Sequence, residues 1–242
     1  MKIVMIHGQN HKGSTYHIGR MLAEQLALQE DITEFFLPGD LNHHCLGCYT
    51  CIEDETKCPF YDEKKVIADA MEKADLLIFT TPNYCMAPSA PMKAFIDLFF
   101  QYWISHRPRK SMFSKKAVVL STTAGIGAGA AIKPIKRTLA YWGIPYVKTY
   151  GLAVQATKWS EVNEDTKNKI RKDMTVLAKR VKSARIGKPS LYIRLLFDMM
   201  ASIRKKNPDY MASETVHWKE NGLLNKEKPW KEQKTDGKEA GR

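Results

Sequence analysis

Five short apolar segments alternate with helix-like segments along the first 185 residues, and this alternation restricts the possible folds more than any other feature of the chain. The apolar segments lie at residues 2–7, 32–37, 74–80, 116–121 and 146–152. Few polar residues interrupt the third, as is typical of a strand covered on both faces within a parallel sheet. Helical periodicity at residues 15–28, 62–73, 89–101, 130–142 and 160–182 follows the strands. The pattern predicts an α/β doubly wound sheet, with Ser160 as the N-cap of the last helix.

The periodicity changes after residues 187–189, which read Gly-Lys-Pro. We therefore predict one domain at residues 1–185 and a helical, basic extension at residues 186–242. Residues 191–200 form an apolar helix whose surface needs cover from the main domain or from a neighbouring subunit; a lid over an active site and an interfacial membrane helix are the alternatives. Residues 231–242 are polar and charged, and we expect them to be mobile.

The net charge of +12 is concentrated towards the end of the chain. From Lys158 onward, 21 Lys and Arg stand against 12 Asp and Glu, which is +9 of the total. Because no aromatic-interleaved basic strand accompanies this charge, we interpret it as a solvated helical face and expect no nucleic-acid partner; attraction of an anionic cofactor or a membrane surface is the alternative. No apolar run approaches the ~20 residues of a membrane span, and the N-terminus lacks a signal-peptide layout, so we expect a cytoplasmic protein.

Four of the five cysteines form a C-x2-C-x2-C-x6-C pattern followed by Pro59: Cys45, Cys48, Cys51 and Cys58. In a reducing compartment such cysteines are metal ligands or redox thiols rather than structural disulfides. A short loop of this kind can wrap a [4Fe-4S] cluster because each thiolate reaches a different corner, as in ferredoxin runs that end in Cys-Pro. Zinc is less natural, since structural zinc sites pair distant C-x2-C units or use histidine. Thiols that hold no cluster are the remaining alternative.

Three loops follow strands of the predicted sheet, at residues 8–15, 81–88 and 122–129. Ligands of doubly wound sheets bind beyond the carboxyl ends of the strands. The first loop combines glycines with Ser14 and Thr15 at the start of a helix, so backbone N–H groups, hydroxyls and the helix dipole converge on an anion. It lacks the Walker ending and the G-x-G-x-x-G pattern, which argues against an NTPase and a dinucleotide fold. The loop predicts a phosphate cradle, with an ordinary N-cap at Ser14 as the alternative.

The second loop carries the longest motif, Thr81-Pro82-Asn83-Tyr84 followed by Ser89-Ala90-Pro91-Met92-Lys93-Ala94-Phe95-Ile96-Asp97. This run resembles the flavin-edge motif of the NAD(P)H-dependent FMN reductases. The resemblance extends over about residues 1–185 and takes in the multimeric flavodoxins and the iron-sulfur flavoproteins. It implies a flavodoxin-like five-stranded parallel sheet of order 2-1-3-4-5, FMN as cofactor, NAD(P)H as co-substrate, and a homodimer or homotetramer.

The resemblance also implies which residues hold the cofactors. The FMN phosphate would lie at Gln9, His11, Ser14 and Thr15, with Lys12 nearby. The isoalloxazine ring would lie between Pro82, Asn83, Tyr84, Cys85 and Met86 on one side and Thr122, Thr123, Ala124 and Gly125 on the other. Cys45, Cys48, Cys51 and Cys58 resemble the compact motif of iron-sulfur flavoproteins, and their loop follows the second strand, at the same sheet end. Two residues differ from the family pattern: Cys85 stands where the family often has an aromatic residue, and Gln9 stands where a serine is common. We interpret Cys85 as a small apolar loop residue rather than a redox thiol.

The resulting hypothesis is an FMN-dependent NAD(P)H oxidoreductase that passes hydride from nicotinamide to FMN and then to a small-molecule acceptor, such as a quinone, a nitro or azo compound, a flavin or oxygen. The first step requires no acid–base residue, because positioning and the flavin environment do the catalysis; Tyr84 is the side chain expected to stack on or shield the ring. The alternative is an iron-sulfur flavoprotein in single-electron transfer with ferredoxin. A flavin-free regulatory or nucleic-acid-binding protein is a third class, suggested only by the basic tail.

Overall fold

Five parallel strands form the central sheet of the protein, whose computed structural model describes residues 1–231. They are β1 (Ile3–His7), β2 (Ile32–Phe36), β3 (Leu76–Tyr84), β5 (Lys116–Thr123) and β6 (Tyr146–Ala153). Their order is β2-β1-β3-β5-β6, and each neighbouring pair is parallel. Counted without the two-residue β4, this is the order 2-1-3-4-5, so the predicted flavodoxin-like doubly wound sheet is confirmed.

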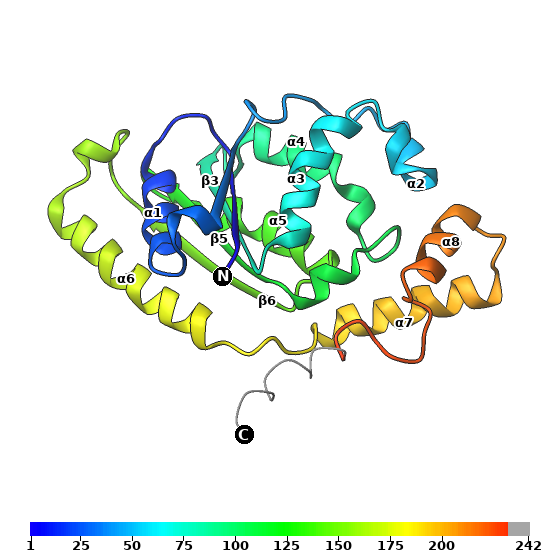
Figure 1. The fold of residues 1–242 in the computed structure, drawn as a ribbon. Helices are drawn as coiled ribbons and strands as arrows, with labels where there is room; N and C mark the ends of the chain where they lie inside the picture. Colours follow the sequence, from blue (N-terminus) through cyan, green and yellow to red (C-terminus); the bar gives the residue numbers. More distant parts are fainter. Residues whose placement is uncertain (232–242) are drawn as a thin grey trace, which may run out of the picture.

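Helices cover both faces of this sheet (Figure 1). On one face lie α3 (Tyr61–Lys73), α4 (Ala90–Leu98) and α5 (Ala128–Tyr141); on the other lie α1 (Ser14–Glu24) and α6 (Glu164–Ser183). Ile6 of β1 packs in the first core and Met5 in the second, because successive strand side chains point to opposite faces. Because helices cover both faces of the sheet, the side chains on both sides of the central strands are apolar. These strands therefore appear in the sequence as continuous hydrophobic runs, and the pattern predicted them.

The parallel register brings three loops to one edge of the sheet. His7 pairs with Thr80 in the neighbouring strand β3, and Pro82 pairs with Thr122 in β5. The chain leaves these three strands at residues 8, 85 and 124. The predicted phosphate loop, flavin-edge loop and glycine-rich turn are therefore neighbours at the carboxyl ends of the central strands, where ligands of such sheets bind.

The C-terminal extension forms two helices, α7 (Leu191–Lys206) and α8 (Ala212–Glu220), on the opposite side of the molecule from α1 (Figure 1). Phe197 of α7 and Trp218 of α8 join Phe113 of the main domain in a third apolar core. The main domain thus covers one face of α7. The division at residue 185 remains a prediction, although α6 ends at Ser183. Of the predicted mobile tail at 231–242, residues 232–242 lie outside the described residues.

Two local predictions were wrong. Ser160 is not the N-cap of α6: it lies in a short 3₁₀ helix, η5 (Trp159–Glu161), and Asn163 is the cap, its side chain accepting a hydrogen bond from the N–H of Thr166 at 2.7 Å. Residues 81–88 are not an open loop, because β3 continues to Tyr84 and returns as β4 (Ala87–Pro88).

Several short elements carry no periodic signal in the sequence. They are α2 (Thr50–Glu53), η1 (Gln29–Asp31), η2 (Glu55–Lys57), η3 (Phe100–Tyr102) and η4 (Lys110–Ser114). Each is five residues or fewer, too short for a 3.6-residue period to be visible.

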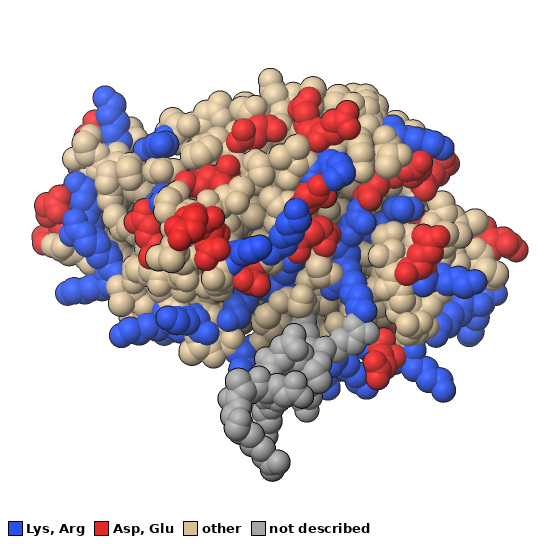
Figure 2. Space-filling view, in the orientation of Figure 1, with Lys and Arg blue, Asp and Glu red and all other residues tan. Residues whose placement is uncertain are grey.

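The basic excess lies mainly on helical surface. In Figure 2, Lys and Arg side chains gather along the edge formed by α6 and around α7, whereas acidic and basic side chains are mixed over the central face. Within residues 1–231, no helix is both long and apolar enough to cross a bilayer.

Candidate functional site

The first loop, residues 8–13, leaves β1 and enters α1 directly. Gly13 occupies the N-cap of α1 and provides no side-chain cap. The alternative of Ser14 as an ordinary N-cap is therefore wrong: Ser14 and Thr15 are buried in the first helical turn. N–H groups at a helix start that no side chain caps, at the positive end of the helix dipole, suit an anion such as a phosphate.

The second loop is a tight hairpin between β3 and β4. Asn83 pairs with Pro88 and Tyr84 with Ala87, so the turn consists of the two residues 85 and 86 alone. Both have positive φ, 50° and 60°, which is the backbone of a type I′ turn. Such turns favour Asn and Gly, and a left-handed conformation costs other residues about 1–2 kcal/mol each. Strained positions of this kind cluster at ligand sites.

The third loop is clasped to the second. Asn83 Nδ2 donates a hydrogen bond to the Ile126 carbonyl at 3.1 Å, and Thr123 Oγ1 donates to the same oxygen at 2.8 Å. Gly127 has a φ of +98°, and a Cβ there would lie 2.4 Å from Met86 Sδ. Asn83 Oδ1 is buried without a hydrogen-bond partner among the described residues, so the clasp holds an acceptor that a ligand N–H could satisfy.

A seam of small hydroxyl side chains joins the first loop to the second. Ser89 Oγ donates to the Gly8 carbonyl at 2.7 Å, and the Ser89 N–H donates to Thr81 Oγ1 at 2.9 Å. The Gly8 N–H donates to the Thr80 carbonyl at 2.7 Å. A Cβ on Gly8 would lie 2.6 Å from Ser89 Oγ, so only glycine fits this close approach. Thr81 and Ser89 belong to the sequence motif, but the motif did not predict that their hydrogen bonds join the first loop to the second.

The structure brings the predicted FMN residues to one edge of the sheet. Gln9, Pro82, Asn83 and Thr123 are half-buried, Ser14, Thr15 and Thr122 are buried, and His11, Tyr84, Cys85, Met86, Ala124 and Gly125 are exposed. Tyr84, Met86 and Ile126 are 46%, 56% and 82% exposed, so an apolar surface faces outward here. A ring system placed over these loops would cover that surface.

A polar network lies beneath the first loop. His7, at the end of β1, hydrogen-bonds Thr80 Oγ1 and Glu34 Oε2, each at 2.9 Å, and Arg20 Nη1 donates to Glu34 Oε1 at 3.1 Å. Burial acts to raise the pKa of Glu34, but the His7 hydrogen bond and the Arg20 charge outweigh it, so the net pKa is lowered. Glu34 is thus held as a carboxylate whose two oxygens are engaged by His7 and Arg20.

The cysteine loop starts from the same edge, because β2 runs parallel to β1 and ends beside it. Gly47 and Tyr49 have positive φ, 66° and 60°, and turn the chain into α2 and then η2. Cys51 is buried at 6% exposure, Cys45 and Cys58 are half-buried, and Cys48 is exposed. All are free thiols, as is Cys85.

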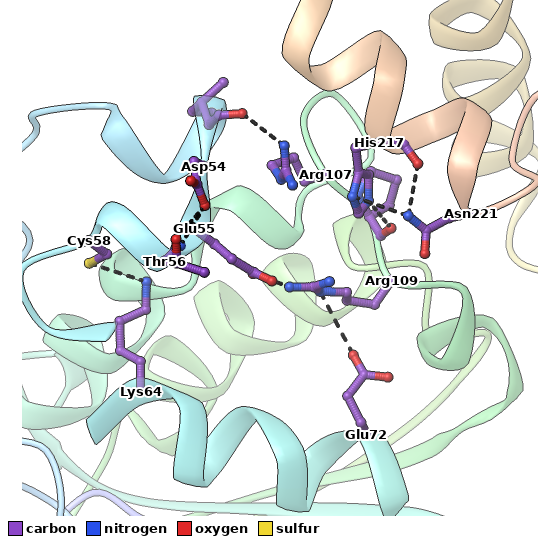
Figure 3. Close-up of polar contacts among 12 residues, drawn as sticks. Asp54, Glu55, Thr56, Cys58, Lys64, Glu72, Arg107, Arg109, His217 and Asn221 are labelled. Atoms are coloured by element: carbon purple, nitrogen blue, oxygen red, sulfur yellow. Dashed lines mark hydrogen bonds and ion pairs between the residues drawn. The ribbon is translucent and has the colours of Figure 1, made fainter. Parts of the chain in front are cut away.

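The thiols of this loop act on one another and on a nearby cation. Cys48 Sγ hydrogen-bonds Thr50 Oγ1 at 3.2 Å, which lowers the pKa of that thiol. Burial raises the pKa of Cys51 to about 11; the charge of Lys64 opposes this rise and the other three thiols add to it. Lys64 Nζ lies 3.6 Å from Cys58 Sγ (Figure 3). A buried ammonium therefore lies against the loop that carries the four cysteines.

Long basic side chains from distant segments support the cysteine loop (Figure 3). Arg107 Nη1 donates to the carbonyls of Ile52 and Glu53, each at 3.2 Å, at the end of α2. Arg109 lies between Glu55 and Glu72 and pairs with both. Ser213 at the start of α8 donates to the Ile52 carbonyl at 3.4 Å. The loop is thus fastened partly by the C-terminal extension.

The donor set of this loop suits a multi-iron cluster better than a single ion. A tetrahedral zinc site needs its ligands about 2.0–2.3 Å from one centre, and no three His, Cys, Asp or Glu side chains within residues 1–231 gather closely enough to hold one ion. A four-iron cluster instead takes each thiolate on a different iron, so its ligands stand farther apart. Four cysteines within residues 45–58, beside a buried cation, fit that requirement chemically.

Comparison with known proteins places these features in a family. Residues 1–158 match the family model described as NADPH-dependent FMN reductase. The chain is 27% identical over 185 residues to an iron-sulfur flavoprotein of Archaeoglobus fulgidus, covering 75% of this chain and 80% of that protein. It is 30% identical over 127 residues to an iron-sulfur flavoprotein of Methanocaldococcus jannaschii, covering 52% of this chain and 65% of that protein.

Solved structures share the fold. The NAD(P)H:quinone oxidoreductase of Methanothermobacter marburgensis superposes with a TM-score of 0.56 at 13% identity, covering 76% of this chain and 98% of that one. At this identity the likeness concerns the architecture of the sheet and its helices.

Proposed function

The chain belongs to the NADPH-dependent FMN reductase family, and on that premise we propose that it is an FMN-dependent oxidoreductase that oxidises NADH or NADPH and reduces a small-molecule acceptor. The observation that carries the proposal is the convergence of three loops at the carboxyl ends of β1, β3 and β5, joined by the Gly8–Ser89 seam and the Asn83–Ile126 clasp. FMN, when bound, supplies the chemistry: it accepts a hydride from the nicotinamide and passes electrons to the acceptor.

In this proposal the first loop holds the phosphate of FMN. The first-turn N–H groups of α1, together with the hydroxyls of Ser14 and Thr15, bind the phosphate oxygens, and Lys12 supplies a positive charge beside Gln9 and His11. Support comes from the Gly13 cap, which offers no side chain to compete for those N–H groups.

The hairpin and the clasp position the isoalloxazine ring. Residues 82–86 and residues 122–125 would hold the ring between them when FMN is bound. Asn83 Oδ1, which lacks a partner among the described residues, accepts a hydrogen bond from the ring system, and Tyr84 shields one face. Hydride transfer needs no protein acid or base, so the chain contributes alignment and exclusion of water.

The acceptor is a quinone, a nitro or azo compound, a flavin or oxygen. The outward surface formed by Tyr84, Met86 and Ile126 is apolar and exposed, which suits a flat, weakly polar acceptor. The same surface suits cover from a second copy of the chain, and we propose a homodimer or homotetramer with the flavin near the subunit interface.

The test is reduction of the bound flavin under anaerobic conditions. Protein loaded with FMN is mixed with NADH or NADPH, and the flavin absorbance is followed. The proposal requires bleaching by at least one of the two nucleotides, followed by recovery when a quinone is added. Flavin that neither nucleotide bleaches would rule out the reductase function.

A second function is favoured by the cysteine loop. Here Cys45, Cys48, Cys51 and Cys58 bind a [4Fe-4S] cluster, which would supply one-electron transfer between a ferredoxin and FMN. Four cysteines in one loop beside Lys64 support it, as does the identity to proteins named iron-sulfur flavoproteins. In this case reduced ferredoxin bleaches the flavin and the nicotinamide nucleotides do not.

A further inference from the structure

Lys64 is buried beneath the cysteine loop, on α3. Only 4% of its surface is exposed, although lysine is almost never buried without a charged partner. The next residue, Lys65, shows the ordinary arrangement: its side chain is 49% exposed and pairs with Asp69 one turn along the helix. Burial of Lys64 therefore needs a physical reason.

No carboxylate supplies that reason within the described residues. The ammonium of Lys64 contacts Cys58 Sγ at 3.6 Å and lies 5.5 Å from the centroid of the Phe99 ring. The acidic side chains nearby are engaged elsewhere: Glu63 pairs with His43, Asp69 with Lys65, and Glu55 and Glu72 with Arg109. Lys64 thus points at a thiol and has no anion of its own.

Water is the simplest alternative partner. Lys64 also borders a cavity of about 240 Å³ between α3, η3 and η4, whose other lining residues include Tyr61 and Tyr102. Water in that cavity could solvate the ammonium and leave it without any function. The two explanations differ in what a neutral side chain at residue 64 would do to the cysteine loop.

We propose that Lys64 is the counter-charge of the cysteine loop, with its ammonium offsetting the negative charge that the four cysteines carry when they hold a cluster. The inference rests on the cluster of the proposed function. Four thiolates outweigh the positive charge of the iron–sulfur core, so the loaded loop is a partly buried anion. A fixed cation against Cys58 lowers the cost of burying it.

The field of Lys64 reaches beyond one sulfur. Its ammonium contacts Cys58 Sγ at 3.6 Å, and all four cysteines lie within residues 45–58, so its charge acts on the whole loop. Each added electron makes the cluster more negative, and a nearby cation stabilises the more negative state. Lys64 therefore raises the reduction potential of the cluster.

The test compares Lys64→Met with Lys65→Met as a matched control, in full-length protein reconstituted anaerobically with Fe²⁺ and sulfide. Methionine has a similar volume and no charge. We expect Lys64→Met to lose iron to a chelator at least tenfold faster than the natural protein and to show a lower cluster reduction potential. Lys65→Met should match the natural protein in its rate of iron loss and in its reduction potential. Lys64→Arg keeps the positive charge, so its reduction potential should lie close to that of the natural protein.

The apoprotein separates a counter-charge from a structural role. Removing an unpaired buried charge is neutral or stabilising, so the melting temperature of apo Lys64→Met should equal or exceed that of the natural apoprotein. A lower apo melting temperature with an unchanged potential would overturn the inference and leave Lys64 as a packing residue. If Lys64→Met loses iron at the natural rate and keeps the natural reduction potential, the counter-charge inference is wrong and Lys64 is a lysine solvated by water in the cavity.

Failure of the proposed cluster looks different from failure of the Lys64 inference. If the natural protein takes up no iron, the cluster is wrong and the counter-charge falls with it. If the natural protein takes up iron and Lys64→Met behaves identically, the cluster stands and only the role of Lys64 is wrong.

Discussion

The three loops proposed to hold FMN, residues 8–15, 81–88 and 122–129 (the flavin loops), begin at the same edge of the sheet as the cysteine loop but are held in a different way. Backbone groups and short side chains hold the flavin loops, as in the Ser89 bond to Gly8 and the Asn83 bond to Ile126. Side chains from other segments hold the cysteine loop: Arg107 bonds the Ile52 carbonyl from 55 residues away, and Ser213 of α8 bonds it from 161 residues away. We therefore expect the cysteine loop to open more readily than the sheet edge that forms the first site.

The largest effect is expected when the buried ion pair Arg204–Glu214, which stabilises the C-terminal extension, is broken. Glu214 is fully buried, pairs with the equally buried Arg204 and hydrogen-bonds His106 Nδ1 at 2.9 Å. Glu214→Ala leaves Arg204 buried and unpaired, and we expect a loss of about 3–5 kcal/mol in unfolding free energy. Urea unfolding measures the loss, and hydrogen exchange should rise in α2 while the flavin loops stay protected.

The matched control for this prediction is the double variant Arg204→Met/Glu214→Leu, which removes both charges and should recover most of the stability. Equal loss of protection in α2 and in the flavin loops would mean that the two regions unfold as one unit, and the contrast between them would be wrong.

Acid should weaken the extension in a defined pH window. His217 is 4% exposed, and burial lowers its pKa to about 4 from 6.5. The folded protein keeps His217 neutral while the unfolded chain binds a proton, so this contribution is complete above pH 6.5 and is lost as the pH falls towards 4. About 2 kcal/mol should be lost by pH 5. Chemical denaturation at pH 8 and pH 5 measures it, and His217→Gln should remove that part of the loss; an equal loss in the variant would contradict the assignment.

A single methyl group on Gly8, where the first loop contacts Ser89, should weaken FMN binding. Gly8→Ala places a Cβ 2.6 Å from Ser89 Oγ and 3.1 Å from the Thr80 carbonyl. We expect FMN to bind at least tenfold more weakly, about 1.4 kcal/mol, by fluorescence titration. Gly129→Ala is the control, because a Cβ there meets nothing within 4 Å. Equal affinity in the two variants would show that the seam does not shape the FMN site.

The smallest effect is expected at the hairpin turn. Cys85 has a φ of 50°, so Cys85→Gly relieves left-handed strain of about 1–2 kcal/mol and loses about 0.5–1 kcal/mol to backbone entropy. A net gain of up to about 1.5 kcal/mol should appear as a higher melting temperature, whereas Ala124→Gly, outside the left-handed region, should show no gain. A destabilised Cys85→Gly would mean that the thiol makes contacts that outweigh the strain.

The contrast between the two sites also explains what the sequence could predict. The strands and the three flavin loops followed from periodicity and a contiguous motif, because each of these patterns lies within a continuous stretch of the chain. The hairpin at Cys85-Met86 was missed, since neither residue is the Gly or Asn that signals a type I′ turn. The predicted cap, Ser160, was wrong because α6 begins only after a 3₁₀ turn at residues 159–161. That turn is too short to show a periodic pattern in the sequence, and Asn163 caps the helix.

The surroundings of the cysteines were beyond prediction for a different reason. Their spacing is local and visible, but the burial of Lys64 and the reach of Arg107 and Arg109 depend on segments that come together only in the fold. A lysine six residues after Cys58 looks like any surface lysine of a helix until Phe99 and the cysteine loop cover it.

The most direct measurement is the FMN and iron content of protein reconstituted and kept under anaerobic conditions, read together with its visible spectrum. The account predicts one FMN and about four irons per chain, with a broad iron–sulfur shoulder beside the flavin bands that is lost in Cys51→Ser. FMN without iron, and a spectrum of flavin alone, would contradict the cluster and the role of Lys64, and would leave the reductase function as the only proposal.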